Sequence, residues 1–429
     1  MANSEQQIDA RLILSATIGN ALEWFDFTVF AFFAGVIAKQ FFPTGDPFVA
    51  LLATWATFGV GFLTRPLGGI IIGNYADRHG RKSALLLTIF VMALGVAIIA
   101  CAPTYSQIGI GAPLLMLAAR FLQGFSTGGE VGSATAFLVE HAPPAQRGFY
   151  GSFQMVSQAV SMLLGALTSV AIAQSLTPAE IESFGWRLPF AVGLLIVPVG
   201  LYVRAGLEES PVFIKERQTQ ATRYSRPPFL EALVSHWREI LVGFGLTVYS
   251  TISTYLFFYY MPTYATQTLG MSFKDGVIAS LCSAVVCIIG ILVSGHLSDL
   301  YGRKKLMMIS VLANLVCAYP LFRLVGQMPT LPVLALVQSI LMLLTSIFYG
   351  AYLALVCELF PAYVRATSLA IGYNFAVMIF GGFAGTVATL LVKFSGEKIS
   401  VVYYGMFGAL VGFVTLLCIK KDRAGQPLL

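Results

Sequence analysis

The chain has 429 residues, of which 57% are hydrophobic and only 11% are charged, and it carries a formal net charge of +6. So few charged side chains cannot cover the surface of a soluble protein of this size, and the composition therefore excludes an ordinary soluble domain. The Lys and Arg residues are spread over several loops and tails, which argues against a nucleic-acid-binding surface.

Apolar runs of about 20 residues recur along the chain, and a run of this length can cross a bilayer as a helix. We expect an all-α membrane protein with twelve transmembrane helices in two pseudo-symmetric six-helix bundles. A long hydrophilic stretch with charges of both signs predicts a cytoplasmic linker between the bundles. The expected domains are the first bundle at 1–203, the linker at 204–236 and the second bundle at 237–429. The expected spans are 12–38, 48–74, 83–102, 110–138, 149–173, 187–203, 237–261, 276–297, 305–325, 331–357, 366–393 and 400–419.

The basic residues predict the orientation of the chain, because Lys and Arg concentrate in cytoplasmic loops. With the N-terminus in the cytoplasm, most of the 26 Lys and Arg residues fall on the cytoplasmic side. The first residues are polar and show no cleavable signal peptide, so the first span itself directs insertion. We expect a multi-pass protein with both termini in the cytoplasm.

One motif occurs twice in the chain. GNYADRHGRK at Gly73–Lys82 returns in altered form as GHLSDLYGRK at Gly295–Lys304, and a Glu followed seven residues later by Arg also occurs once in each half. Such an internal repeat is typical of transporters that rock two halves around a central site. We expect these segments to form a cytoplasmic gate of charge pairs; the alternative is that their basic residues only set the topology. The predicted gate residues are Asp77, Arg78, Arg81, Glu140, Arg147, Asp299, Arg303, Glu358 and Arg365.

Ionisable residues occur inside the predicted spans of the first half, namely Glu23, Asp26, Arg65, Arg120 and Glu130. Charges at membrane depth are costly and usually functional. Helical rise places Asp26 at a depth similar to that of Arg120, and Arg65 at a depth similar to that of Glu130, so we predict these two ion pairs. The alternative is that one or both pairs only hold helices together.

A proton carrier at the membrane midplane must be a carboxylate, because all four His residues lie at predicted cytoplasmic span ends. Asp26 is the first candidate and Glu23 the second, with Arg120 as their partner in coupling. An anionic substrate that competes for Arg120 would release Asp26, which would then take up a proton. Proton and anion would bind together, which is symport by linkage.

Other polar residues on the predicted spans could line a substrate pocket. For any single tyrosine the packing interpretation remains open, because tyrosines are common in membrane proteins. Besides Arg120, the candidate substrate-binding residues are Arg65, Asn20, Gln154, Gln158, Tyr255, Tyr259, Tyr352 and Asn374.

Motifs of other protein classes are missing from the sequence. It contains no G-x-x-x-x-G-K-[ST] nucleotide loop, no H-E-x-x-H, no nucleophile elbow and no cluster of metal ligands. We therefore expect no cofactor, no metal and no enzymatic activity, with the proton gradient as the energy source. An intramembrane enzyme and a nutrient sensor with a transporter fold remain the alternatives.

The repeated loops resemble the major facilitator superfamily over the whole chain. Within it, five blocks resemble the metabolite–proton symporter family: GNALEWFDF, GFLTRPLGG, ARFLQGFSTGGEVG, RGFYGSFQ and GWRLPF. The resemblance implies two six-helix bundles around a central cavity, a monomer, and proton-driven uptake across a bacterial inner membrane.

Two segments, YMPTYATQTLGMSFKD at Tyr260–Asp275 and VKFSGEK at Val392–Lys398, look most like the citrate and tricarballylate branch of that family. Trp24 and Gly129 depart from that branch and follow the wider family. Arg120 stands where the proline and betaine carriers tend to have Lys. The resemblance thus implies a di- or tricarboxylate such as citrate as substrate; a zwitterionic compatible solute of the proline or betaine type, or a monocarboxylate such as shikimate, is the alternative.

Overall fold

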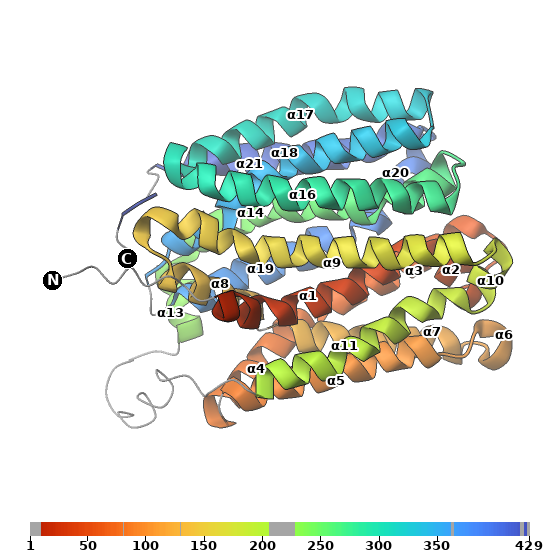
Figure 1. Cartoon of the computed structure of the whole chain (residues 1–429), viewed down its shortest axis with the longest axis horizontal. Coiled ribbons are helices and arrows are strands. Elements are labelled where there is room, and N and C mark those ends of the chain that lie inside the picture. The colour runs from red at the N-terminus through yellow and green to blue at the C-terminus, as the bar shows by residue number, and fades with distance from the viewer. Residues whose placement is uncertain are drawn as a thin grey trace.

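The computed structural model describes residues 10–79, 81–128, 130–205, 228–361, 364–420 and 424–426; some side chains within these ranges, including those of Asp77, Arg78, Arg81 and Glu130, are not described. The described chain is a bundle of long helices that run along one common axis (Figure 1). The helices of the N-terminal half are α1 (Ala10–Phe32), α2 (Ala34–Phe41), α3 (Pro47–Leu63), α4 (Arg65–His79), α5 (Arg81–Cys101), α6 (Tyr105–Ile108), α7 (Gly111–Thr127), α8 (Glu130–His141), α9 (Arg147–Ser175), α10 (Pro178–Ser183) and α11 (Leu188–Ala205).

The C-terminal half is interrupted more often, because three π-helical turns break its α-helices. Its elements are α13 (Pro228–Ser235), α14 (Trp237–Thr254), η3 (Tyr255–Tyr259), α15 (Met261–Thr263), η4 (Tyr264–Thr268), α16 (Phe273–Tyr301), α17 (Arg303–Gln327), α18 (Leu331–Glu358), α19 (Arg365–Ala376), η5 (Val377–Gly381), α20 (Ala384–Ser395) and α21 (Val401–Cys418). Short 3₁₀ turns, η1 (Pro144–Gln146), η2 (Gly185–Arg187) and η6 (Lys398–Ser400), precede α9, α11 and α21.

Each of the twelve predicted spans coincides with one helix or with consecutive helices. Within the described residues, eight helices are long and apolar enough to cross a membrane. The bent pair that consists of Glu23–Phe32 in α1 and Ala34–Phe41 in α2 is one more candidate. Large apolar side chains cover the outside of the bundle; Phe90 is 67% exposed and Val316 is 70% exposed. Such a surface is stable against lipid rather than water.

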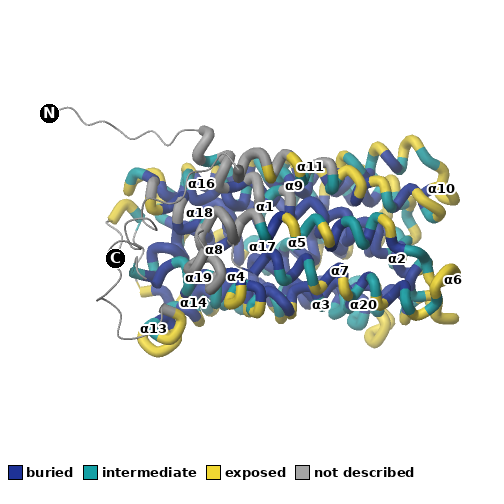
Figure 2. Tube along the Cα trace, turned by 90° about the horizontal axis from the view of Figure 1, so that it is seen from below, coloured by how far each residue is buried: buried dark blue, intermediate teal, exposed yellow. Residues whose placement is uncertain are grey.

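Two of the predicted segments contain features that the sequence analysis did not indicate. The predicted span 12–38 consists of two helices, α1 and α2, which meet at 69° at Phe33. The bend brings Gly35 close to Gln267 of the other half, where an added Cβ would lie 3.3 Å from the Gln267 amide nitrogen. The predicted linker 204–236 ends in a helix, α13, which exposes most of its residues at one end of the bundle (Figure 2). The division into domains otherwise stays a prediction, because residues 206–227 lie outside the described chain.

Close helix packing fixes the position of α7 against α3 and α4. A Cβ added to Gly124 would lie 1.5 Å from the Gly61 carbonyl oxygen, and one added to Gly128 would lie 2.0 Å from the Arg65 carbonyl oxygen. Only residues without side chains allow the backbones to approach this closely. The Thr64 hydroxyl, which donates to the Phe121 carbonyl at 3.2 Å, ties the same helices together.

The break between α3 and α4 follows from Pro66. Proline lacks a backbone N–H and is accepted in the first turn of a helix, so a new helix can begin at Arg65. The break leaves Arg65 in the first turn of α4, beside Phe62 at the end of α3. Local sequence thus decides where the Arg65 guanidinium enters the core.

Candidate functional site

The first buried cluster joins α1 to α7. One Asp26 carboxylate oxygen accepts a hydrogen bond from the Gln123 amide nitrogen at 2.6 Å and lies 3.4 Å from Arg120 Nη1. Arg120 Nη1 also donates to the Gln123 side-chain oxygen at 2.6 Å. The three side chains form a closed ring of interactions, and all of them are buried. The predicted Asp26–Arg120 pair is present.

Phenylalanine rings enclose this ring of interactions. The Arg120 guanidinium carbon lies 3.7 Å from the centre of the Phe30 ring, 5.2 Å from that of Phe27 and 5.4 Å from that of Phe58. Aromatic faces stabilise a desolvated guanidinium by cation–π attraction. We call Asp26, Arg120 and Gln123 the inner network, because its hydrogen bonds and ring contacts lie within the N-terminal half.

The second cluster joins α1 to α4. Arg65 Nη2 lies 3.7 Å from a Glu23 carboxylate oxygen, and both side chains are buried. The Arg65–Glu130 pair predicted from depth stays a prediction, because the Glu130 side chain is not described. Glu23 and Asp26 lie one turn apart on α1, so the same helix supplies an acid to each arginine.

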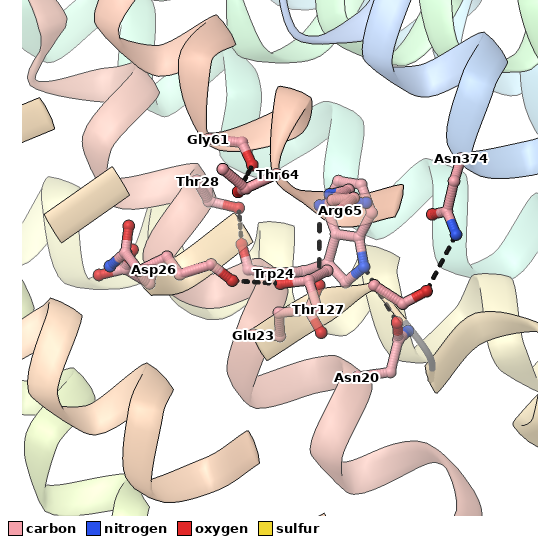
Figure 3. Close-up of polar contacts among 12 residues, drawn as sticks. Asn20, Glu23, Trp24, Asp26, Thr28, Gly61, Thr64, Arg65, Thr127 and Asn374 are labelled. Carbon is pink, nitrogen blue, oxygen red and sulfur yellow. Dashed lines mark hydrogen bonds and ion pairs between the residues drawn. The ribbon is translucent and has the colours of Figure 1, made fainter. Parts of the chain in front are cut away.

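Arg65 lies among aromatic side chains that reach the other half of the molecule. Its guanidinium carbon is 4.3 Å from the centre of the Phe62 ring and 5.5 Å from that of Trp24. Figure 3 shows Arg65 beside Trp24 and Glu23 of α1. Trp24 packs against Tyr255 and Tyr259 of the C-terminal half, with ring centres 6.2 and 6.4 Å apart. The Glu23–Arg65 pair therefore adjoins the interface between the halves.

Several buried polar atoms of this region have no hydrogen-bond partner among the described residues. They include three guanidinium nitrogens of Arg65, the Tyr255 hydroxyl and both side-chain polar atoms of Gln154. Buried polar groups are normally hydrogen-bonded, and those that are not call for an explanation. The Arg65 guanidinium, the Tyr255 hydroxyl and the Gln154 amide nitrogen are able to donate hydrogen bonds, which is what a bound carboxylate requires.

The other predicted pocket residues divide between this region and packing roles. Asn20 donates to the Ser157 hydroxyl at 2.7 Å and accepts from the Trp24 indole at 3.0 Å, so it orients Trp24. Asn374 donates to the Gly128 carbonyl at 2.9 Å and so bridges the two halves.

Gln158 and the two remaining tyrosines complete the predicted set. Gln158 is buried, and its side-chain nitrogen has no hydrogen-bond partner among the described residues. Tyr259 accepts a long hydrogen bond of 3.4 Å from Thr28. Tyr352 lies 2.5 Å from the Thr247 hydroxyl and stacks on Phe348, contacts that all belong to the C-terminal half. A substrate role for Tyr352 stays a prediction, and its contacts support packing.

Charged residues at one end of the bundle hold the halves together; we call this the latch end and define it by Glu140, Arg147, Asp299, Arg303, Glu358 and Arg365. Arg365 Nη1 is 2.5 Å from the Glu140 carboxylate of the other half. Arg303 lies 2.9 Å from Glu358 and 3.4 Å from Asp299. Asp299 thus has a neighbouring basic residue, Arg303, as expected, whereas the side chains of Asp77, Arg78 and Arg81 lie outside the described residues. The role of these segments as a gate stays a prediction.

The role of Asp299 differs from the expectation of simple charge pairing. Its two carboxylate oxygens accept hydrogen bonds from the backbone N–H groups of Gly148 and Phe149, at 2.8 and 2.9 Å. These N–H groups lie in the first turn of α9, so an aspartate of one half caps a helix of the other. Arg147 turns instead to the C-terminal segment and donates to the Gln426 carbonyl at 2.5 Å.

Gln123 is the residue that sequence reasoning missed. It lies three positions after Arg120 on α7, and residues so spaced share a helix face. A search for polar residues three or four positions from Arg120 would therefore have identified Gln123. A glutamine carries no charge, however, and a search for ionisable residues passes over it.

Family models match both halves of the chain. The model described as "Sugar (and other) transporter" matches residues 12–227, and the model of the major facilitator superfamily matches residues 276–428. A citrate-proton symporter of Klebsiella pneumoniae is 36% identical over 412 residues, which cover 96% of this chain and 92% of the relative. The chain belongs to the major facilitator superfamily.

Within the superfamily the relatives carry different named substrates. A proline/betaine transporter of Escherichia coli K12 is 35% identical, over 97% of this chain and 84% of the relative. A solved structure of the xylose transporter XylE of E. coli has a TM-score of 0.78 at 19% identity, over 97% of this chain and 99% of that one, and it shows the shared fold. This major facilitator is a multi-pass membrane transporter and not an enzyme.

Proposed function

We propose that this transporter is a proton-coupled symporter that takes up a small organic acid, with a di- or tricarboxylate such as citrate as the first candidate. The observation that carries the proposal is Arg65. It is a fully buried guanidinium whose nitrogens lack hydrogen-bond partners among the described residues, at the interface between the halves. A guanidinium binds a carboxylate through two parallel hydrogen bonds, and desolvation strengthens the interaction.

The acids on α1 supply the proton-binding groups that such a symporter needs. Glu23 and Asp26 are buried beside Arg65 and Arg120, so each is balanced by a positive charge in the substrate-free state. A substrate carboxylate that competes for a guanidinium leaves an acid without its partner, and a buried carboxylate without a partner takes up a proton. Substrate and proton then favour each other's binding.

Alternating access requires that the latch end opens and closes. Its contacts among the described residues include ion pairs and a helix cap, which a rocking motion of two rigid halves can break and reform. We propose that this end faces the cytoplasm of a bacterium, with the protein in the inner membrane, both termini inside and the monomer as the functional unit. The relatives in Klebsiella pneumoniae and Escherichia coli support this setting.

A zwitterionic compatible solute is the second candidate, and a specific observation favours it. The rings of Trp24, Tyr255 and Tyr259 form a cluster next to Arg65 and Glu23. Aromatic faces bind quaternary ammonium groups, and Arg65 would hold the carboxylate of the same molecule. The sequence departs from the citrate branch at Trp24 itself.

Uptake by proteoliposomes separates these candidates. The purified protein is reconstituted, an inward proton gradient is imposed, and uptake of labelled citrate, 2-oxoglutarate, shikimate and betaine is compared. We expect citrate or another di- or tricarboxylate to accumulate and a protonophore to abolish the accumulation. Betaine uptake without uptake of any di- or tricarboxylate would reverse the assignment in favour of the zwitterion, and shikimate uptake alone would assign a monocarboxylate.

A further inference from the structure

The short helix α13 and the first turn of α14 carry their large apolar side chains on the outside. Val234 is 58% exposed and Trp237 is 50% exposed. The less exposed positions between them and before them hold Glu231, Ala232 and His236. A helix on a water-facing surface has the opposite pattern, with apolar residues inside and charges outside. We call the exposed apolar residues of this segment the outer face of α13; they are Phe229, Leu230, Leu233, Val234 and Trp237.

The outer face of α13 continues into a surface that lies against lipid. α14 belongs to the helix Trp237–Thr268, which is long and apolar enough to cross a membrane. Leu241 follows Trp237 by one turn on the same side of this helix and is also exposed. α13 packs against α19 as well, which exposes Phe375. The outer face of α13 therefore borders apolar side chains that a bilayer covers.

The turn between α13 and α14 has the residues of a membrane surface. The backbone of His236 has φ −124° and ψ 23°, which is not helical, so α13 leaves the axis of α14 at this residue. Directly after the turn, the Arg238 guanidinium carbon lies 5.3 Å from the centre of the Trp237 ring. Trp and Arg side chains favour the level of the lipid headgroups. The turn thus marks this level at the latch end, where Figures 1 and 2 show α13.

We propose that α13 docks on the phospholipid leaflet at the latch end, with its outer face in the boundary between headgroups and acyl chains. Interfacial helices bury an apolar face roughly 5–10 Å into this boundary. The acid of α13, Glu231, accepts a hydrogen bond from the Ser235 hydroxyl at 2.7 Å, so its carboxylate has a polar partner beside the lipid. The docking needs no particular substrate and does not depend on the proposed function.

Tryptophan fluorescence tests this docking, because Trp237 is exposed whereas Trp24, Trp55 and Trp186 are buried. The protein is placed in phosphatidylcholine nanodiscs, which leave both ends open to the solution. Part of the lipid carries bromine either near the ester end or near the far end of the acyl chain. The difference between the unmodified protein and Trp237→Phe is the signal of Trp237. We expect bromine near the ester end to lower this signal by about twofold and bromine at the far end to lower it less, because an interfacial helix stays shallow.

A second probe lies on α13 itself. Val234→Trp in the Trp237→Phe background puts an indole on the outer face of α13. Ala145→Trp in the same background is the matched control, because Ala145 is exposed in η1 at the latch end. We expect brominated lipid to quench the indole at position 234, and iodide in the solution to quench the one at position 145.

Two outcomes would overturn the proposal. In one, iodide quenches the indole at position 234 and brominated lipid does not, which would show that the outer face of α13 lies in water. In the other, neither quencher reaches this indole, which would show that protein covers the face, either a second copy of the chain or the linker.

Discussion

At the scale of single residues, neutral amides and buried arginines determine the chemistry of the core. Gln123 donates to Asp26 and accepts from Arg120, so an uncharged side chain sets the distance between two charges. Arg65 depends on aromatic rings instead of hydrogen bonds among the described residues. The two arginines lie in one core, yet Arg120 is hydrogen-bonded to Gln123, whereas three guanidinium nitrogens of Arg65 have no hydrogen-bond partner among the described residues.

We predict that Gln123→Leu destabilises the protein by about 1–3 kcal/mol, because it leaves buried groups of Asp26 and Arg120 without a short hydrogen bond. Thermal unfolding in detergent measures the loss. Gln327→Leu is the control, since Gln327 is exposed at the end of α17. Equal stability of the two variants would show that the inner network is not held by Gln123.

We predict that Arg65→Lys weakens substrate binding by about tenfold or more, because an ammonium group cannot form the two parallel hydrogen bonds of a guanidinium. The measurement is the substrate-induced rise in melting temperature over a concentration series. Arg323→Lys, on the exposed face of α17, serves as the control. Unchanged binding in Arg65→Lys would place the substrate carboxylate elsewhere.

At the scale of elements, glycines and helix breaks place these side chains. Gly124 and Gly128 let α7 approach α3 and α4, which brings Arg120 and Gln123 to Asp26. Pro66 permits the break that begins α4 at Arg65. The π-helical turn η3 carries Tyr255 and Tyr259 side by side at the interface, with ring centres 5.1 Å apart. Such turns are frequent at functional sites.

We predict that Gly124→Ala lowers the free energy of unfolding by about 1–3 kcal/mol or more, because the added methyl group would overlap the Gly61 carbonyl and force α7 away from α3. Gly326→Ala is the matched control: nothing lies within 4 Å of its added Cβ, and we expect a gain of about 0.5–1 kcal/mol from helix propensity. Thermal unfolding of both variants checks the opposite signs. A stable Gly124→Ala variant would contradict the close packing of these helices.

At the scale of the whole molecule, polar contacts among the described residues join the two halves at the latch end. Asp299 caps α9, Arg365 pairs with Glu140, and Arg147 binds the carbonyl of Gln426 in the C-terminal segment. Nearer the middle, Trp24 and Phe62 contact Tyr255 through apolar rings. When the latch end opens, its polar groups can form hydrogen bonds with water in place of those they lose. Its opening is therefore reversible.

We predict that Asp299→Asn shifts the equilibrium toward opening of the latch end by about 1 kcal/mol, because the neutral amide is a weaker cap for α9. Distances between spin labels at Ala145 and Leu300, in a variant with the native cysteines replaced, should show a larger population of long distances. Asp275→Asn is the control, since Asp275 lies at the opposite end of the same helix, α16. Identical distance distributions in both variants would contradict the capping role.

The sequence alone determined the membrane class, the positions of the helices and the repeat, because apolar length and charge placement act locally and need no partner to be recognised. It also predicted the Asp26–Arg120 pair, since opposite charges at similar depth in the membrane lower each other's desolvation cost by pairing. The tertiary structure decided the rest: that Gln123 joins this pair, that Arg65 lies 3.7 Å from Glu23, and that Asp299 caps a helix of the other half. Those contacts depend on the rotation and bending of helices, which close packing across the whole bundle sets and which no single segment encodes.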